Sequence, residues 1–115
     1  MHNEIKSILE TVVVGGKPVP FACQKFEGDS PLYIVYSIIL ETPRVCADDL
    51  PETSVVEIDI DVYAKAISNL VGTIGSVKKQ FIAAGWTWCE DSPEIFEDET
   101  GYIHRAITFE KERMI

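Results

Sequence analysis

Cysteine is scarce in this chain of 115 residues, which contains only Cys23, Cys46 and Cys89. An odd number of widely separated cysteines forms neither a disulfide framework nor a CxxC motif for metal or redox chemistry. We therefore expect each one to be a small buried or half-buried side chain in a reducing compartment. Because metal sites usually show clustered ligands, we expect no bound metal ion and no cofactor.

Long apolar runs are missing as well. No stretch approaches the roughly 18 consecutive apolar residues of a membrane-spanning helix. The N-terminal segment MHNEIKSILE lacks the basic and apolar regions of a signal peptide. We therefore expect no membrane partner.

Basic residues are outnumbered, with 10 against 19 acidic residues and a net charge of −9. The chain therefore lacks the basic stripe that binds nucleic-acid phosphates. Such a surface repels nucleic acid but does not exclude DNA as a passing neighbour, because an acidic channel lets DNA slide without sticking. The length, together with a 46% hydrophobic content and no linker or repeat, predicts a single domain over residues 1–115.

The most informative segment that is present covers residues 54–64, SVVEIDIDVYA. Aliphatic and polar side chains alternate along it with a period of two, which predicts a long strand with one face on a core. Its other face carries three carboxylates, which we expect to line solvent or an aqueous lumen: Glu57, Asp59 and Asp61.

The remaining elements are predicted from periodicity and from turn residues. Apolar spacing predicts helices at residues 2–11 and 68–84, the second with a buried stripe and with Ser68 as its N-cap. Its stripe consists of Leu70, Ile74, Val77 and Phe81. Further strands are predicted at residues 32–40, 86–90 and 102–111, the first apolar on both faces and central; residues 42–53 are predicted to form a loop.

This order of elements is helix, strand, strand, helix, strand, strand. Because strands that are close in sequence pair through hairpins, it predicts an α+β fold. We expect a mostly antiparallel sheet of about four strands with two helices packed on one face.

Two chemical interpretations of the acidic strand stay open at this point. Glu57, Asp59 and Asp61 could bind a divalent metal or act as acid and base, as in a small nuclease-like enzyme. The alternative is a solvated strand face in a protein without catalytic residues. His104 is expected at a surface or interface. Trp86 and Trp88 share one strand face and are expected in the core or at a subunit interface.

Four segments carry further motifs: SPLYIVYS, EIDIDVYAK, VKKQFIAAGW and YIHRAITFEKE. They include the patterns P-x-Y-x-V-Y, Y-x-K and HR-x-x-x-F. In this order they resemble the small tail-completion or tail-terminator proteins of long-tailed bacteriophages and prophages, over residues 19–112. The matching positions are Pro31, Tyr33, Val35, Tyr36, Tyr63, Lys65, His104, Arg105 and Phe109.

This resemblance implies a non-enzymatic structural protein that caps the tail tube and joins it to the head connector. Such proteins typically form a hexameric ring of identical subunits, in the cytoplasm of the bacterial host during assembly and then in the virion. The resemblance therefore implies DNA only as passing cargo. A small-ligand-binding domain is a further alternative. Long loops in compact domains tend to be functional, so a subunit-contact loop is expected at Val45, Cys46, Ala47, Asp48, Asp49, Leu50 and Pro51.

Overall fold

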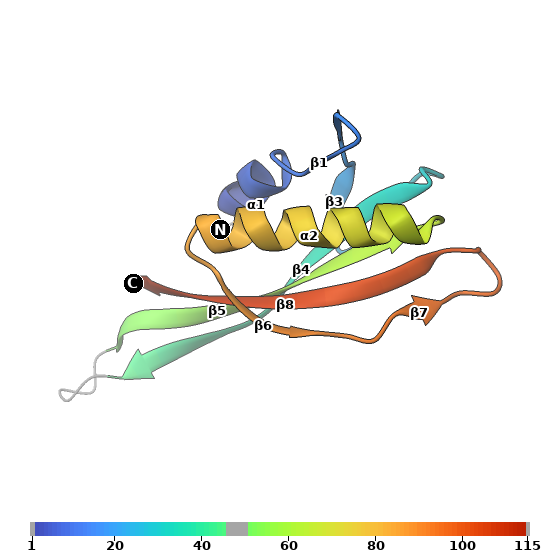
Figure 1. Cartoon of the computed structure of the whole chain (residues 1–115). Coiled ribbons are helices and arrows are strands. Elements are labelled where there is room, and N and C mark those ends of the chain that lie inside the picture. The colour runs from blue at the N-terminus through green and yellow to red at the C-terminus, as the bar shows by residue number, and fades with distance from the viewer. Residues whose placement is uncertain (1, 46–50, 115) are drawn as a thin grey trace.

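The alternating segment is the centre of the sheet. The computed structural model describes residues 2–45 and 51–114, and in it the segment belongs to strand β5 (Pro51–Ala64) (Figure 1). On one side β5 pairs with β4 (Leu32–Val45), and on the other with β8 (Ile103–Met114), both antiparallel. The long sheet makes the molecule elongated, with extents of 53 × 28 × 22 Å.

Shorter strands complete the sheet. Its order is β3–β4–β5–β8–β6, and β7 also pairs with β8. The short strands are β3 (Phe21–Cys23), β6 (Thr87–Asp91) and β7 (Ile95–Phe96), and β3 runs parallel to β4. Two further strands, β1 (Val13–Val14) and β2 (Lys17–Pro18), form a separate hairpin. The α+β class and the mostly antiparallel pairing are confirmed, but the expected four strands were too few.

The predicted loop at residues 42–53 was partly wrong. Residues 42–45 continue β4, and residues 51–53 begin β5. Prolines suggested a loop there, but Pro43 lies in a strand at the sheet edge and Pro51 is the first residue of its strand. Both are positions at which a strand tolerates proline. β4 was also predicted to be central. It becomes an edge strand after Tyr36, because β3 pairs with it only from Ile34 to Tyr36.

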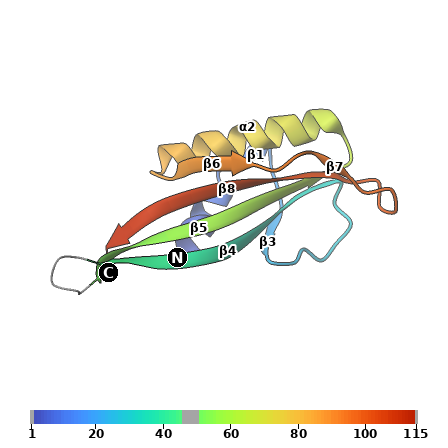
Figure 2. The same cartoon turned by 90° about the horizontal axis from the view of Figure 1, so that it is seen from below.

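Both helices, α1 (His2–Leu9) and α2 (Ile67–Ala83), lie on the same side of the sheet (Figure 2). The predicted α2 stripe is confirmed, since Leu70, Ile74, Val77 and Phe81 are buried. Ser68 is not the cap. The N-cap is Ala66, which makes no side-chain capping bond. Gly85 ends the helix with φ 95°, a left-handed conformation that favours glycine.

Helices and sheet meet in one aliphatic and aromatic core. The inward side chains of β5 from Val56 to Val62 are fully buried. Phe81 of α2 stacks on Phe109 of β8 at 4.9 Å between ring centroids, and Trp86 meets Phe81 edge-on at 6.0 Å. The sheet is therefore bound to α2 by close aromatic packing.

Two charged clusters hold the outer elements on this core. The carboxylate of Asp91 accepts hydrogen bonds from Lys78 Nζ at 2.8 Å and Trp88 Nε1 at 2.7 Å, and it pairs with Arg105 at 3.2 Å. Glu4 of α1 pairs with Lys111 at 2.6 Å and with Arg113 at 3.2 Å. Asp91 thereby links β6 to α2 and β8, and Glu4 links the N-terminal helix to the last strand.

Truncating the aromatic core should be costly. We expect Phe81→Ala to lower the free energy of unfolding by about 3–5 kcal/mol, because the ring is fully buried and its removal leaves a cavity. Urea denaturation measures this loss. Ile82→Ala, one residue along the same helix and half-exposed, is the control and should cost less than about 1 kcal/mol. Equal losses in the two variants would contradict the packing described above.

Candidate functional site

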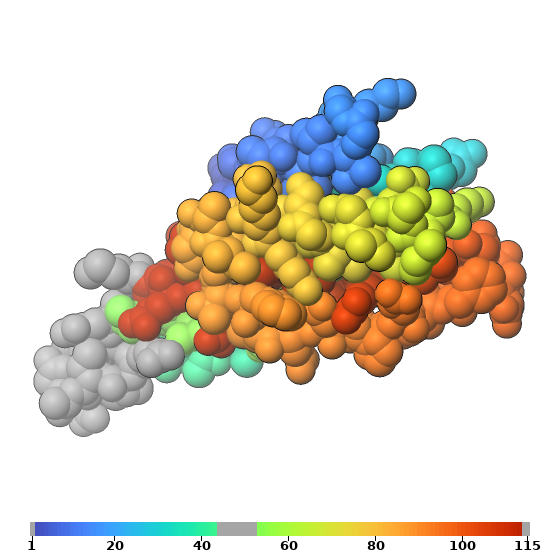
Figure 3. Space-filling view, viewed as in Figure 1, coloured from blue at the N-terminus to red at the C-terminus, as the bar shows by residue number. Residues whose placement is uncertain are grey.

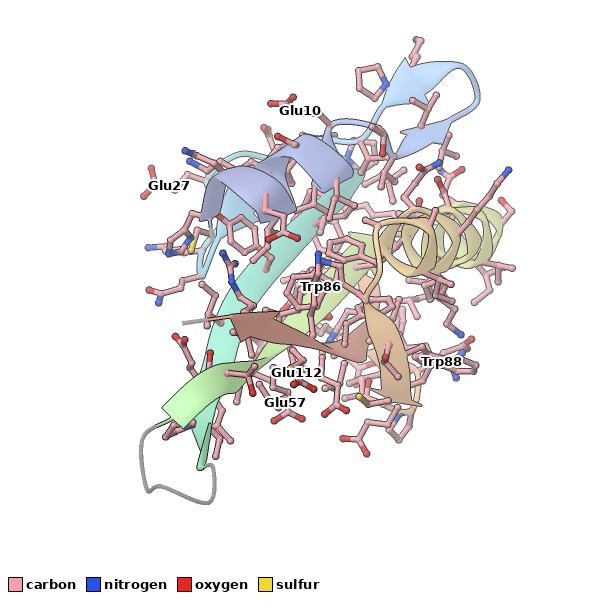
Figure 4. All side chains as sticks on the ribbon, turned by 90° about the vertical axis from the view of Figure 1, so that its left-hand side faces the viewer. Glu10, Glu27, Glu57, Trp86, Trp88 and Glu112 are labelled. Atoms are coloured by element: carbon pink, nitrogen blue, oxygen red, sulfur yellow. The ribbon has the colours of Figure 1, made fainter. Side chains whose placement is uncertain are left out.

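Among residues 2–45 and 51–114, no helix covers the face of the sheet that points away from α1 and α2 (Figure 2). We call this surface the open face. Figure 4 shows Glu57 and Glu112 directed away from the helices, whereas Trp86 lies between helices and sheet. By alternation and register, the open face of the three long strands consists of Tyr33, Val35, Ser37, Leu40, Thr42, Val55, Glu57, Asp59, Asp61, Tyr63, His104, Ala106, Thr108, Glu110 and Glu112.

A row of stacked rings crosses one end of the open face. Phe26 stacks on Tyr33 at 4.4 Å, Tyr33 on Tyr63 at 4.8 Å, and Tyr63 on His104 at 4.7 Å, measured between ring centroids. Tyr102 meets Tyr33 edge-on at 5.3 Å. The rings share one row because Tyr33, Tyr63 and His104 are cross-strand partners. The row ties β4, β5 and β8 together at this end.

Beside this row is an open hollow of about 310 Å³, lined in part by Gln24, Glu97 and Thr100. Burial raises the pKa of Tyr33, and so do the charges of Tyr102, Glu97 and Asp61. Burial and the neighbouring Asp61 likewise raise the pKa of Tyr63. Both tyrosines are therefore held neutral in a negative field.

Asp61 sits between the aromatic row and the other acidic residues. Its Oδ1 lies 3.4 Å from Nδ1 of His104, yet this buried oxygen accepts no hydrogen bond. Burial raises the pKa of Asp61, and the charge of His104 opposes that shift. Asp59, one position along the face, accepts a hydrogen bond from the Thr108 hydroxyl at 2.6 Å. Each carboxylate thus has a partner on β8.

Glu57 faces Glu110 across the β5–β8 pair, so two like charges are directly opposite each other. Cys89 lies in their field: burial raises the pKa of its thiol, and Glu110, Glu57 and Glu90 raise it further. The open face is therefore most negative at the end away from the aromatic row.

The metal-site alternative gains no support from this geometry. In residues 2–45 and 51–114 no group of three or more His, Cys, Asp or Glu side chains is placed to hold a metal ion. Asp59 and Asp61 project at separate positions along the strand and contact different residues of β8. The sequence had given His104 no partner. The strand pairing supplies Asp61 and Tyr63, which sequence alone could not show.

The cysteine prediction was wrong for two of the three residues. Cys23 and Cys89 are exposed, because Cys23 ends the edge strand β3 and Cys89 lies in a bulge of β6. Cys46 lies outside the described residues. Most of the predicted contact loop also lies outside the described residues: only Val45 and Pro51 are described, as strand ends.

Trp86 is in the core as expected. Trp88 is half-exposed, and the Lys78 ammonium lies over its ring, 4.0 Å from the centroid.

Comparison of the chain with protein-family models and with curated proteins gave no match. In the described part of the chain, neither helix is long and apolar enough to cross a membrane.

Neutralising Asp61 should change stability in a pH-dependent way. Because burial raises its pKa, folding favours the protonated carboxyl, and the ionised form costs stability at neutral and alkaline pH. Asp61→Asn should therefore be more stable than wild type, by about 1 kcal/mol at about pH 8, and lose this advantage as the pH falls through the raised pKa.

Thermal unfolding from about pH 8 to about pH 4 measures the effect. The control is Asp59→Asn, which weakens the acceptor of Thr108 and should give no gain at the alkaline end. An Asp61→Asn variant that is less stable than wild type at alkaline pH would contradict the role given to burial.

Proposed function

We propose that this chain is a structural subunit of a homomeric ring that completes the tail tube of a long-tailed phage or prophage and joins it to the head connector. Such a subunit performs no reaction, acts in the bacterial host cytoplasm during assembly and remains in the virion. The proposal combines the motif resemblance over residues 19–112 with one feature of the fold. That feature is an acidic sheet face, uncovered by helices, along a molecule 53 Å long.

The open face suits the wall of a channel for DNA. An isolated domain gains little by leaving a broad sheet face uncovered and opposing Glu57 to Glu110 on it. In a ring, the same carboxylates repel the phosphates of passing DNA, so that the duplex moves through without being bound. Asp59 and Asp61 extend the negative wall along β5.

Electron microscopy of the concentrated protein tests assembly, alone and with isolated tail tubes that lack their terminal ring. We expect closed rings, free or at tube ends, because ring closure needs only identical contacts repeated around an axis. A protein that forms no ring under either condition would remove the proposal.

A charge-reversal pair tests the channel wall. Glu57→Lys with Glu110→Lys keeps a like-charge pair across β5 and β8 but makes it basic. The control is Glu10→Lys with Glu27→Lys, which changes the net charge equally at exposed positions on the helix side (Figure 4).

We expect assemblies of the open-face variant to bind duplex DNA at least about tenfold more tightly than the control at low salt, with binding lost steeply as salt rises. Fluorescence anisotropy with labelled duplex measures both. Equal affinities in the two variants would place the open face away from the channel.

A further inference from the structure

The hollow beside the aromatic row is bordered by two loops that lie far apart in the sequence. One follows β3 and covers residues 24–31, and the other joins β7 to β8 and covers residues 97–102. Both lie at the end of the molecule where α2 begins (Figure 2), and in the space-filling view the turn between β7 and β8 forms that end (Figure 3). The Tyr102 hydroxyl donates a hydrogen bond of 2.6 Å to the backbone oxygen of Ser30, which joins the two loops.

The first loop begins with a tight turn in a sparsely populated conformation. Among the residues that the structure describes, Gln24 is the one non-glycine residue with a positive φ, at 64°. The Lys25 N–H bonds the Cys23 backbone oxygen across it at 2.7 Å, and the turn brings Phe26 onto Tyr33. A non-glycine residue persists in the left-handed region only where its surroundings hold it there. This side of the hollow therefore has a fixed shape.

The second loop presents the carboxylate of Glu97. Two backbone hydrogen bonds of 2.8 Å close its turn, from the Glu97 N–H to the Tyr102 oxygen and from the Gly101 N–H to the Glu97 oxygen. Glu97 lines the hollow and is half-buried. Within residues 2–45 and 51–114, its carboxylate has neither a hydrogen-bond donor nor an ion-pair partner. A half-buried carboxylate of this kind can accept bonds from a ligand.

The charges that act on the tyrosines of the hollow are negative. Burial raises the pKa of Tyr33 and of Tyr63, and the charges of Glu97 and Asp61 raise both further. The buried Oδ1 of Asp61 accepts no hydrogen bond. A cation that enters the hollow therefore meets two carboxylates and the oxygens of two neutral phenols.

Two lysines also belong to this end of the molecule. Lys25 is an exposed residue of the rim, and the Lys65 ammonium lies 4.9 Å from the centroid of the Tyr102 ring. Neither lysine pairs with the Glu97 carboxylate in the described part of the chain. The Lys65 contact shows that a ring of this cluster attracts a cation.

We propose that the hollow receives the guanidinium group of an arginine side chain on a partner protein. Glu97 accepts two parallel N–H bonds, and the hydroxyl oxygens that line the hollow accept the remaining donors. A guanidinium packs flat against aromatic rings, whereas a lysine ammonium is more strongly hydrated and gains less in an open hollow. A volume of about 310 Å³ is sufficient for such a group.

The chemistry favours a side chain over free arginine, because the carboxylate of a free amino acid is repelled by Glu97 and Asp61. The inference goes beyond the proposed function, since neither the ring nor the DNA channel requires this site. It concerns the other end of the open face from Glu57 and Glu110.

NMR titration of the isotope-labelled subunit with capped tripeptides tests the proposal. The peptides are Gly-Arg-Gly, Gly-Lys-Gly and Gly-citrulline-Gly, each acetylated and amidated; citrulline has the shape of arginine without its charge. The arginine peptide should cause saturable shifts in the amides of residues 24–26 and 97–102. It should bind at least about tenfold more tightly than the citrulline peptide, because the charge-assisted bonds to Glu97 are lost. The lysine peptide should bind more weakly than the arginine peptide.

Glu97→Gln should weaken binding of the arginine peptide at least about tenfold. Glu99→Gln is the matched control, because it removes the same charge from the same turn at an exposed position outside the hollow, and it should bind like wild type. The amide spectrum of each variant shows whether it is folded. The comparison of peptides on the wild type gives a result even where a variant does not fold.

Three outcomes overturn the site: no saturable shifts with the arginine peptide, equal affinity for the arginine and citrulline peptides, or shifts centred on Glu57 and Glu110. Equal binding of the lysine peptide overturns the assignment to guanidinium. Free arginine that binds as tightly as the capped peptide overturns the assignment to a protein side chain.

Discussion

The pairing of β5 on both sides along nearly its whole length is the constraint on which the rest of the structure depends. β4 pairs with it from Ala64 to Pro51 and β8 from Ala64 to Thr53, so the side chains along this length are assigned to one face or the other. A slip of one residue would place Glu57, Asp59 and Asp61 in the core and expose its aliphatic row, which fixes the register. The helices, the aromatic row and the open face all take their positions from this strand.

The parts of the fold that were predictable from sequence are those with a strong local period. Alternation identified β5, and the stripe from Leu70 to Phe81 identified α2. The sequence could not show which strands are neighbours. The row from Phe26 to His104 joins residues 78 positions apart along the chain, through a pairing that no local pattern encodes. The prolines in residues 42–53 led to a wrong loop prediction, because a strand tolerates proline at a sheet edge, as at Pro43, and at its first residue, as at Pro51.

Negative charge is distributed unevenly over the surface, as the proposed ring with an acidic channel requires. Carboxylates gather on the open face and around β7, whereas residues 66–77, most of which lie in α2, include none. Because like charges repel, two copies of the chain cannot meet through their acidic open faces without a cost in free energy. The repulsion that is proposed to keep DNA from the channel wall therefore also disfavours a contact between two open faces.

The ion pairs of Glu4 with Lys111 and Arg113 have a consequence for folding during synthesis of the chain. They join the first helix to the last strand across more than a hundred residues. Contacts of such long sequence separation form late and slowly. While the chain is still on the ribosome, α1 lacks its partner strand and β5 lacks one of its two neighbours. The fold can therefore be completed only after β8 has been synthesised, and products that end before Ile103 lack one of the two strands that pair with β5.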